Sequence, residues 1–167
     1  MTDTRIGTLR QQDGLGVVRM EERFATDAAD LWSAVTDPDR LARWIAVVEG
    51  EPRLGGTVRA RFTSSWEGSL RIDVCEAPLR LLVTSTGDDP DDGPTVIEAV
   101  LTPDGDGTRL VVEERGLPLP GVAAYGAGWQ AHVEDLRALL EGRPAAVWLD
   151  RWRELEPVYR DSESALD

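Results

Sequence analysis

Hydrophobic and polar positions alternate strictly in the first patterned part of the chain. Over residues 17–24, Val18, Met20 and Phe24 fall on one face, and the charged residues between them fall on the other. This period of two is typical of a β-strand with one face buried. The pattern predicts that the fold begins with this strand, and that residues 1–16 form a flexible segment before it.

Residues 27–44 change to a period that is typical of helices. Two short helices are predicted, and the second begins at Pro38, because proline is well tolerated at the first helical position. Trp32 and Trp44 lie on the apolar sides of these helices. We expect both rings to attach the helices to the sheet; the alternative is that Trp44 or Ile45 closes one end of a cavity.

Alternating segments then follow one another with only turn residues between them. The predicted strands span residues 57–63, 69–75, 79–86, 95–101 and 108–115, and residues 47–52 are a candidate for one more. Turn-rich stretches such as GDDPDDGP and TPDGDGT join them. Because no helical pattern separates these strands, they are expected to form an antiparallel sheet rather than a parallel one.

The last third of the chain has a helical pattern. Apolar residues recur at helical spacing from Tyr125 to Leu140, and Gly142 is a natural stop. Residues 148–159 form a second amphipathic stretch with two tryptophans. Because soluble monomers avoid exposing a large apolar stripe, this stretch should fold back on its own domain or pack on a second chain. A homodimer therefore remains an alternative.

A strand, two short helices, several antiparallel strands and one long helix follow the order of a helix-grip fold. In this α+β fold a curved antiparallel sheet wraps around the long C-terminal helix. The expected domain spans residues 17–142, and residues 143–167 form a C-terminal amphipathic helical extension with a frayed end from residue 162.

Four stretches carry a resemblance to a known family. In chain order they are ADLWSAVTDPDRLARWI, GSLRIDVCEAPLRLLVT, LTPDGDGTRLVVEERG and GAGWQAHVEDLRALLEG. Together they resemble the START-like (SRPBCC) superfamily, and within it the family similar to the C-terminal domain of the activator of the heat-shock-protein-90 ATPase. The resemblance implies a helix-grip fold with a cavity between the sheet and the long helix. The chain departs from many relatives at residues 84–86, where Thr-Ser-Thr replaces an aromatic strand end.

Composition excludes several classes of partner. The formal net charge of −13 repels nucleic acids and anionic membranes, and no basic cluster offsets it. Apolar runs are too short for membrane insertion. A single cysteine and a polar N-terminus without a signal-peptide core favour the cytoplasm.

Candidate catalytic chemistry is sparse. His132 is the only histidine, so a histidine-based metal site is not expected within one chain. No G-x-S-x-G elbow occurs, and the acidic turns lack the order of calcium ligands. Cys75 is expected to be a small buried or edge residue. The sequence therefore predicts no metal and no cofactor.

Three carboxylates lie in register with apolar residues of the predicted strands: Glu22, Glu98 and Glu114. They point inward, or they lie at strand ends or on the opposite faces. A carboxylate inside the fold must be paired or protonated. The available partners include Arg59, Arg61, Arg71 and His132.

The expected function is non-catalytic binding of an apolar small molecule, which is lipid-like, acyl or aromatic. Small inward residues such as Ala60 and Ala99 leave space between sheet and helix. The expected ligand contacts are Met20, Glu22, Trp44, Val58, Ala60, Phe62, Leu70, Ile72, Trp129, His132, Val133 and Leu136.

Two alternatives are retained. An enzyme resembling the superfamily's polyketide cyclases and dehydratases would use His132 with an inward carboxylate as acid and base. A co-chaperone or stress-adaptor module would bind a protein instead of a small ligand. The resemblance does not favour a chaperone partner, because the chain has no counterpart of the separate N-terminal domain with which the co-chaperone engages its client ATPase.

Overall fold

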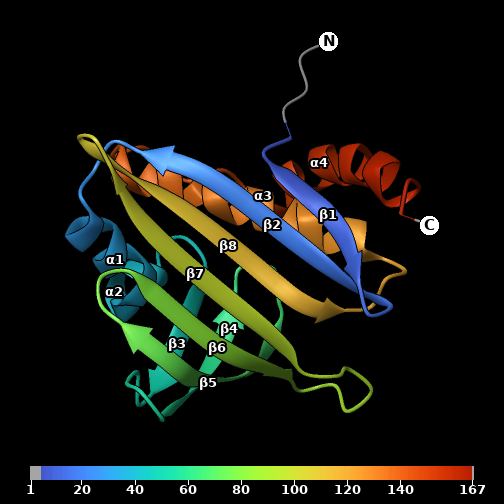
Figure 1. The fold of residues 1–167 in the computed structure, drawn as a ribbon, viewed down its shortest axis with the longest axis horizontal. Coiled ribbons are helices and arrows are strands. Elements are labelled where there is room, and N and C mark those ends of the chain that lie inside the picture. Colours follow the sequence, from blue (N-terminus) through green and yellow to red (C-terminus); the bar gives the residue numbers. More distant parts are fainter. Residues whose placement is uncertain (1–4, 167) are drawn as a thin grey trace.

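The structure, a computed structural model, describes residues 5–166. Eight antiparallel strands form one sheet in the order β1-β2-β8-β7-β6-β5-β4-β3, and the sheet curves around the long helix α3 (Figure 1). The strands are β1 Gly7–Gln12, β2 Leu15–Phe24, β3 Ala46–Gly50, β4 Thr57–Phe62, β5 Glu67–Glu76, β6 Arg80–Gly87, β7 Thr95–Asp104 and β8 Gly107–Leu117. The helices are α1 Ala28–Thr36, α2 Pro38–Leu41, α3 Val122–Leu140 and α4 Trp148–Glu163. The expected α+β helix-grip fold is confirmed.

The expectation that residues 1–16 form a flexible segment is wrong for residues 7–12. These residues form β1, which pairs with β2 along its whole length. The signal for this hairpin is the Asp13-Gly14 pair. Both residues have positive φ, 54° and 79°, as a tight two-residue hairpin turn requires. Residues 1–4 lie outside the described part of the chain.

Strand register fixes which residues face the helix. Val18, Glu114, Ile97, Val83 and Ile72 lie opposite one another across five neighbouring strands, so they share the concave face. Their burial agrees with this placement, since all except the half-buried Ile97 are buried. The inward face predicted for residues 17–24 is confirmed.

The two short helices pack through Trp44. Its indole Nε1–H donates to the backbone carbonyl of Ala34 at the end of α1 (2.9 Å), and the ring is buried in the main core. Trp32 is half-buried against the same core. The structure thus shows the packing role that the sequence favoured for these rings.

Helix α3 occupies the concave face of the sheet (Figure 1). Val133 and Leu136 are buried in the core, and at the outer end Arg137 pairs with Glu22 of β2. The guanidinium of Arg137 also lies 4.7 Å from the centre of the Phe24 ring. Glu22 therefore joins β2 to α3. Its partner Arg137 was not among the partners expected from the sequence.

Helix α4 folds back onto α3, which is the first of the two arrangements expected for residues 148–159. Gly126 leaves room for Tyr159, because a Cβ there would lie 2.7 Å from the Tyr159 ring. The Tyr159 hydroxyl donates to Gln130 Oε1 (2.5 Å) and accepts from the Gly7 backbone N–H (3.0 Å). This buried group thus ties α4 to both α3 and β1.

The end of α4 is more ordered than the frayed segment expected from residue 162. The helix continues to Glu163, whose carboxylate accepts a hydrogen bond from the backbone N–H of Gly121 at the start of α3 (2.6 Å). Leu166 packs partly buried against the core. Residue 167 lies outside the described part of the chain.

Asp135 gives the first testable prediction, because burial on α3 raises its pKa to about 6. The nearby charge of Glu134 also raises this pKa, while a hydrogen bond to the Ala146 backbone lowers it. Between the unfolded and folded pKa values the native state binds more protons, so stability falls as pH rises through this window. Asp135→Asn is therefore expected to raise the melting temperature at pH 7 by ~2–4 °C, which corresponds to ~1 kcal/mol.

Melting scans of the parent and of Asp135→Asn at about pH 4 and pH 7 test this expectation. The gain should shrink toward the acid end, where Asp135 is already protonated. A variant that is less stable than the parent at pH 7 would show that the ionised carboxylate is favourable in the fold.

Candidate functional site

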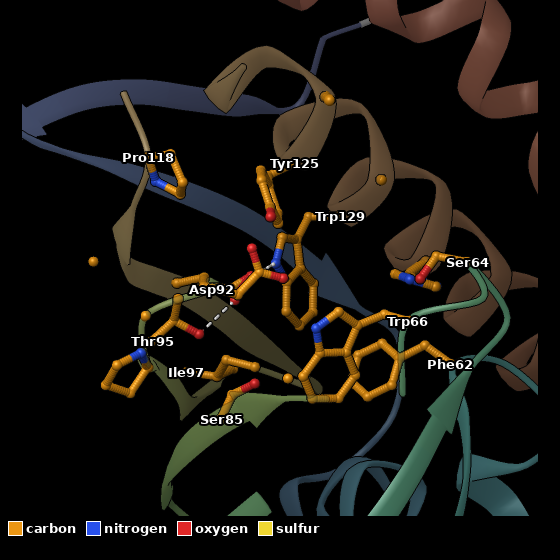
Figure 2. Close-up of a pocket in the computed structure, with 18 of the residues that line it drawn as sticks. Phe62, Ser64, Trp66, Ser85, Asp92, Thr95, Ile97, Pro118, Tyr125 and Trp129 are labelled. Carbon is orange, nitrogen blue, oxygen red and sulfur yellow. Dashed lines mark hydrogen bonds between the residues drawn. The ribbon is translucent and has the colours of Figure 1, made fainter. Parts of the chain in front are cut away.

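A cavity of about 560 Å³ lies between one end of the sheet and the first half of α3. Helix α3 contributes Tyr125 and Trp129 to one wall, while Ser85, Thr95 and Ile97 of β6 and β7 form the opposite wall (Figure 2). The volume is within the range of small-molecule sites. The exposed residues 91–94, between β6 and β7, mark a side on which the cavity reaches solvent.

Trp66 and Phe62 close one end of the cavity (Figure 2). Their rings meet edge to face with centroids 5.1 Å apart. Gly68 and Gly87 pair across β5 and β6, and a Cβ on Gly68 would lie 2.5 Å from the Trp66 ring. This glycine pair therefore provides the space that Trp66 occupies.

Glu114 is the ionisable group on the sheet wall. It is 8% exposed, and its two oxygens accept hydrogen bonds from Trp129 Nε1–H (2.9 Å) and the Thr95 hydroxyl (3.0 Å) (Figure 2). Burial raises the pKa of Glu114, and these two hydrogen bonds oppose the change only in part. The cavity thus contains a carboxyl group whose neutral form is favoured by its surroundings.

His132 lines the cavity one helical turn beyond Trp129 and is surrounded by aromatic rings. The ring centroids of Trp148, Phe62 and Trp129 lie 5.3, 5.9 and 6.0 Å from its imidazole. Burial lowers the pKa of His132 to about 3, although a hydrogen bond to the Trp44 backbone acts in the opposite direction. The imidazole is therefore neutral near neutral pH.

Two buried polar atoms beside the cavity have no hydrogen-bond partner within residues 5–166. They are Nδ1 of His132 and Nε1 of Trp148. Because the other imidazole nitrogen bonds to the Trp44 backbone, Nδ1 is an acceptor, while the indole N–H is a donor. Unpaired groups of this kind are rare in folded interiors, because a buried polar group normally has a hydrogen-bond partner such as a protein atom, a ligand or a water molecule.

The structure brings three of the twelve expected contact residues to this cavity: Phe62, Trp129 and His132. The remaining nine lie elsewhere. Seven of them are buried in the interior: Met20, Trp44, Val58, Ala60, Ile72, Val133 and Leu136. Leu70 is half-buried, and Glu22 pairs with Arg137. The cavity lies nearer to the loop that joins β6 and β7 than the residues expected from the sequence suggested.

The three carboxylates considered as inward-facing lie in three different surroundings. Glu114 faces the cavity, Glu22 contacts α3, and Glu98 pairs on the other face of the sheet. The ion-pair partners of Glu98 are Arg80 (2.7 Å) and Arg115 (3.0 Å). None of the three is paired with the partners expected from sequence.

Sequence reasoning missed several cavity residues. Trp66 lies in a turn, Trp148 is the first residue of α4, and Tyr125 was counted only as part of the helix. Ser85 lies in the Thr-Ser-Thr departure at residues 84–86, so the altered strand end does reach the cavity. Cys75, expected to be buried or at an edge, is exposed on β5.

The arrangement does not form the acid–base pair of the enzyme hypothesis. His132 bonds to the Trp44 backbone, whereas Glu114 bonds to Trp129 and Thr95. Among the described residues, no group of three or more His, Cys, Asp or Glu side chains is placed to hold a metal ion. No helix in the described part of the chain is long and apolar enough to cross a membrane.

Comparisons with known proteins agree with this architecture. The family model described as Activator of Hsp90 ATPase homolog 1-like protein matches residues 25–141. This range runs from the end of β2 through α3, so it includes nearly all of the cavity lining. A search of curated proteins finds no match.

Solved structures extend the likeness to nearly the whole chain. CalU16 from Micromonospora echinospora is 23% identical with a TM-score of 0.76, and the match covers 98% of this chain and 99% of that one. EF2215 from Enterococcus faecalis, a protein of unknown function, is 19% identical with a TM-score of 0.77 and coverages of 96% and 92%. DynU16, described as a protein in the dynemicin biosynthetic locus, is 28% identical with a TM-score of 0.71, over 80% of this chain and 50% of that one.

Proposed function

Because the chain belongs to the family of Activator of Hsp90 ATPase homolog 1-like proteins, within the START-like superfamily, we propose that it binds an apolar small molecule between sheet and helix. Binding is proposed without catalysis. The similar structure DynU16 is described as a protein in the dynemicin biosynthetic locus, and a product of small-molecule biosynthesis is the kind of ligand that we propose.

The observation that carries the proposal is the aromatic lining of the cavity. Five aromatic side chains converge on it from four parts of the chain: Phe62, Trp66, Tyr125, Trp129 and Trp148. A core packed for stability alone would fill this volume, since protein interiors are close-packed. A preformed concave site with apolar walls and a few polar groups is typical of small-molecule binding.

Polar anchors support the same proposal. The acceptor Nδ1 of His132 and the donor indole N–H of Trp148 are unpaired and lie behind the cavity surface, so a small shift of either ring on binding would present it to a ligand hydroxyl. The pKa of about 3 makes His132 a poor general base near neutral pH, because efficient catalytic groups have pKa values near the working pH. Hydrogen bonding is therefore the role we assign to it.

The proposal predicts saturable binding of a neutral apolar fluorophore, N-phenyl-1-naphthylamine, with quenching of tryptophan emission. Ile97→Trp places a large ring in the cavity and is expected to weaken this binding at least ~10-fold. The matched control is Val96→Trp, on the same strand but on the other face of the sheet. Its affinity should equal that of the parent.

Fluorescence titration of the three chains measures this difference, with circular dichroism as a check that each is folded. Equal affinity of Ile97→Trp and the parent would place the bound probe outside the cavity. No saturable binding by the parent would contradict the proposal and favour a protein-binding module.

A further inference from the structure

The described lining of the cavity contains acidic side chains but no arginine or lysine. The acidic side chains are those of Asp91, Asp92 and Glu114. His132 adds no positive charge, because burial keeps its imidazole neutral near neutral pH. A bound anion would therefore meet carboxylates and no counter-charge.

Glu114 differs from its neighbours in the sheet. Glu98 and Glu113 each form an ion pair with Arg115, at 3.0 Å in both cases. The hydrogen-bond partners of Glu114 are a neutral indole and a neutral hydroxyl, and no arginine contributes to the shift of its pKa. A buried carboxyl group without a cation is costly in its charged form, so it favours a ligand that supplies one.

Aromatic side chains line the same cavity as Glu114. Trp129 donates to Glu114 directly, and Figure 2 shows Tyr125 and Trp66 on two sides of the Trp129 ring. The faces of Trp and Tyr rings attract cations through the quadrupole of the π-system. Carboxylate and ring faces together are suited to an ammonium group attached to an apolar body.

We infer that the ligand of this cavity is an apolar amine, with its protonated nitrogen paired to Glu114 and its body among the aromatic rings. This inference rests on the proposed function. It selects among the expected ligand classes, because fatty acids and other acyl anions carry the wrong charge for the lining.

Three matched compounds test the inference: 2-(1-naphthyl)ethylamine, 2-(1-naphthyl)ethanol and 1-naphthaleneacetate, each measured by displacement of N-phenyl-1-naphthylamine. They share one ring system and differ in charge. The amine is expected to bind at least ~10-fold more tightly than the alcohol, because charge-assisted hydrogen bonds are about twice as strong as neutral ones. The carboxylate should bind most weakly.

Glu114→Gln keeps the shape of the side chain and its ability to accept from Trp129, but it cannot become charged. It should bring the amine to the affinity of the alcohol and leave the alcohol within ~2-fold of its parent value. The control is Glu49→Gln, which removes the same charge from an exposed position on β3 that does not line the cavity. This variant should keep the preference for the amine.

The order of the three compounds on the parent chain is informative whether or not Glu114→Gln folds. An alcohol or a carboxylate that binds as tightly as the amine would overturn the inference, as would an amine preference that survives in folded Glu114→Gln. Binding of the fluorophore itself reports on the cavity, so either result leaves the proposed function standing. Loss of fluorophore binding in the parent would instead remove the proposed function.

Discussion

Removing residues 143–167 is expected to lower the melting temperature by at least ~10 °C or to abolish the cooperative transition, because several buried contacts are lost together. Leu155 and Tyr159 of α4 are 1% and 0% exposed. Without them, the small residues at 126–128 of α3 become an apolar groove open to water. The hydroxyl partner of Gln130 and of the Gly7 backbone is lost as well.

A thermal scan of the chain ending at Gly142, with size-exclusion chromatography, measures this effect. The matched control ends at Asp161, which keeps Leu155 and Tyr159 and should melt within a few degrees of the parent. A shortened chain that stays monodisperse and melts like the parent would mean that α4 contributes little to the core.

Leu136→Ala is expected to destabilise the fold by ~3 kcal/mol, as typical truncations of buried leucines do. The Leu136 side chain is 0% exposed on the face of α3 that packs in the main core. The substitution removes three carbon atoms from a place where both the sheet and the helix are fixed by other contacts. The space that remains can close only in part, which adds to the cost of lost burial.

Chemical denaturation at constant pH measures the free energy of unfolding for the parent and the variant. Leu149→Ala on α4 is the control, since Leu149 is 45% exposed and its truncation should change stability by less than ~0.5 kcal/mol. Equal effects of the two substitutions would contradict the placement of α3 inside the curved sheet.

Most of the sheet could be predicted because alternation reports burial on one face directly. Each strand from β2 to β8 overlaps a segment predicted from this pattern. β1 was missed because Leu9 is the only residue of GTLRQQ with a large apolar side chain, and because the strand pairs at the edge of the sheet. Its true signal is local: the Asp13-Gly14 turn requires backbone conformations that these residues adopt easily.

The candidate site was harder to predict, for a geometric reason. Alternation tells which residues face inward, but it does not tell where along the strands the helix leaves space. Phe62, Trp129 and His132 were found because they lie on inward faces near the open end. Trp66 lies in a turn without a period, and Trp148 reaches the cavity only because α4 folds back across α3.

If a ligand occupies the cavity beside α3, five of the six tryptophans report it by their positions. Three of them line the cavity, Trp66, Trp129 and Trp148, while Trp32 and Trp44 belong to the short helices and the link that follows them. The measurement is an NMR titration of the indole N–H signals with N-phenyl-1-naphthylamine, assigned by single Trp→Phe variants. The signals of Trp66, Trp129 and Trp148 are expected to shift together to saturation while those of Trp32 and Trp44 stay in place. Shifts confined to Trp32 and Trp44, or no saturable shift at all, would contradict ligand binding in this cavity.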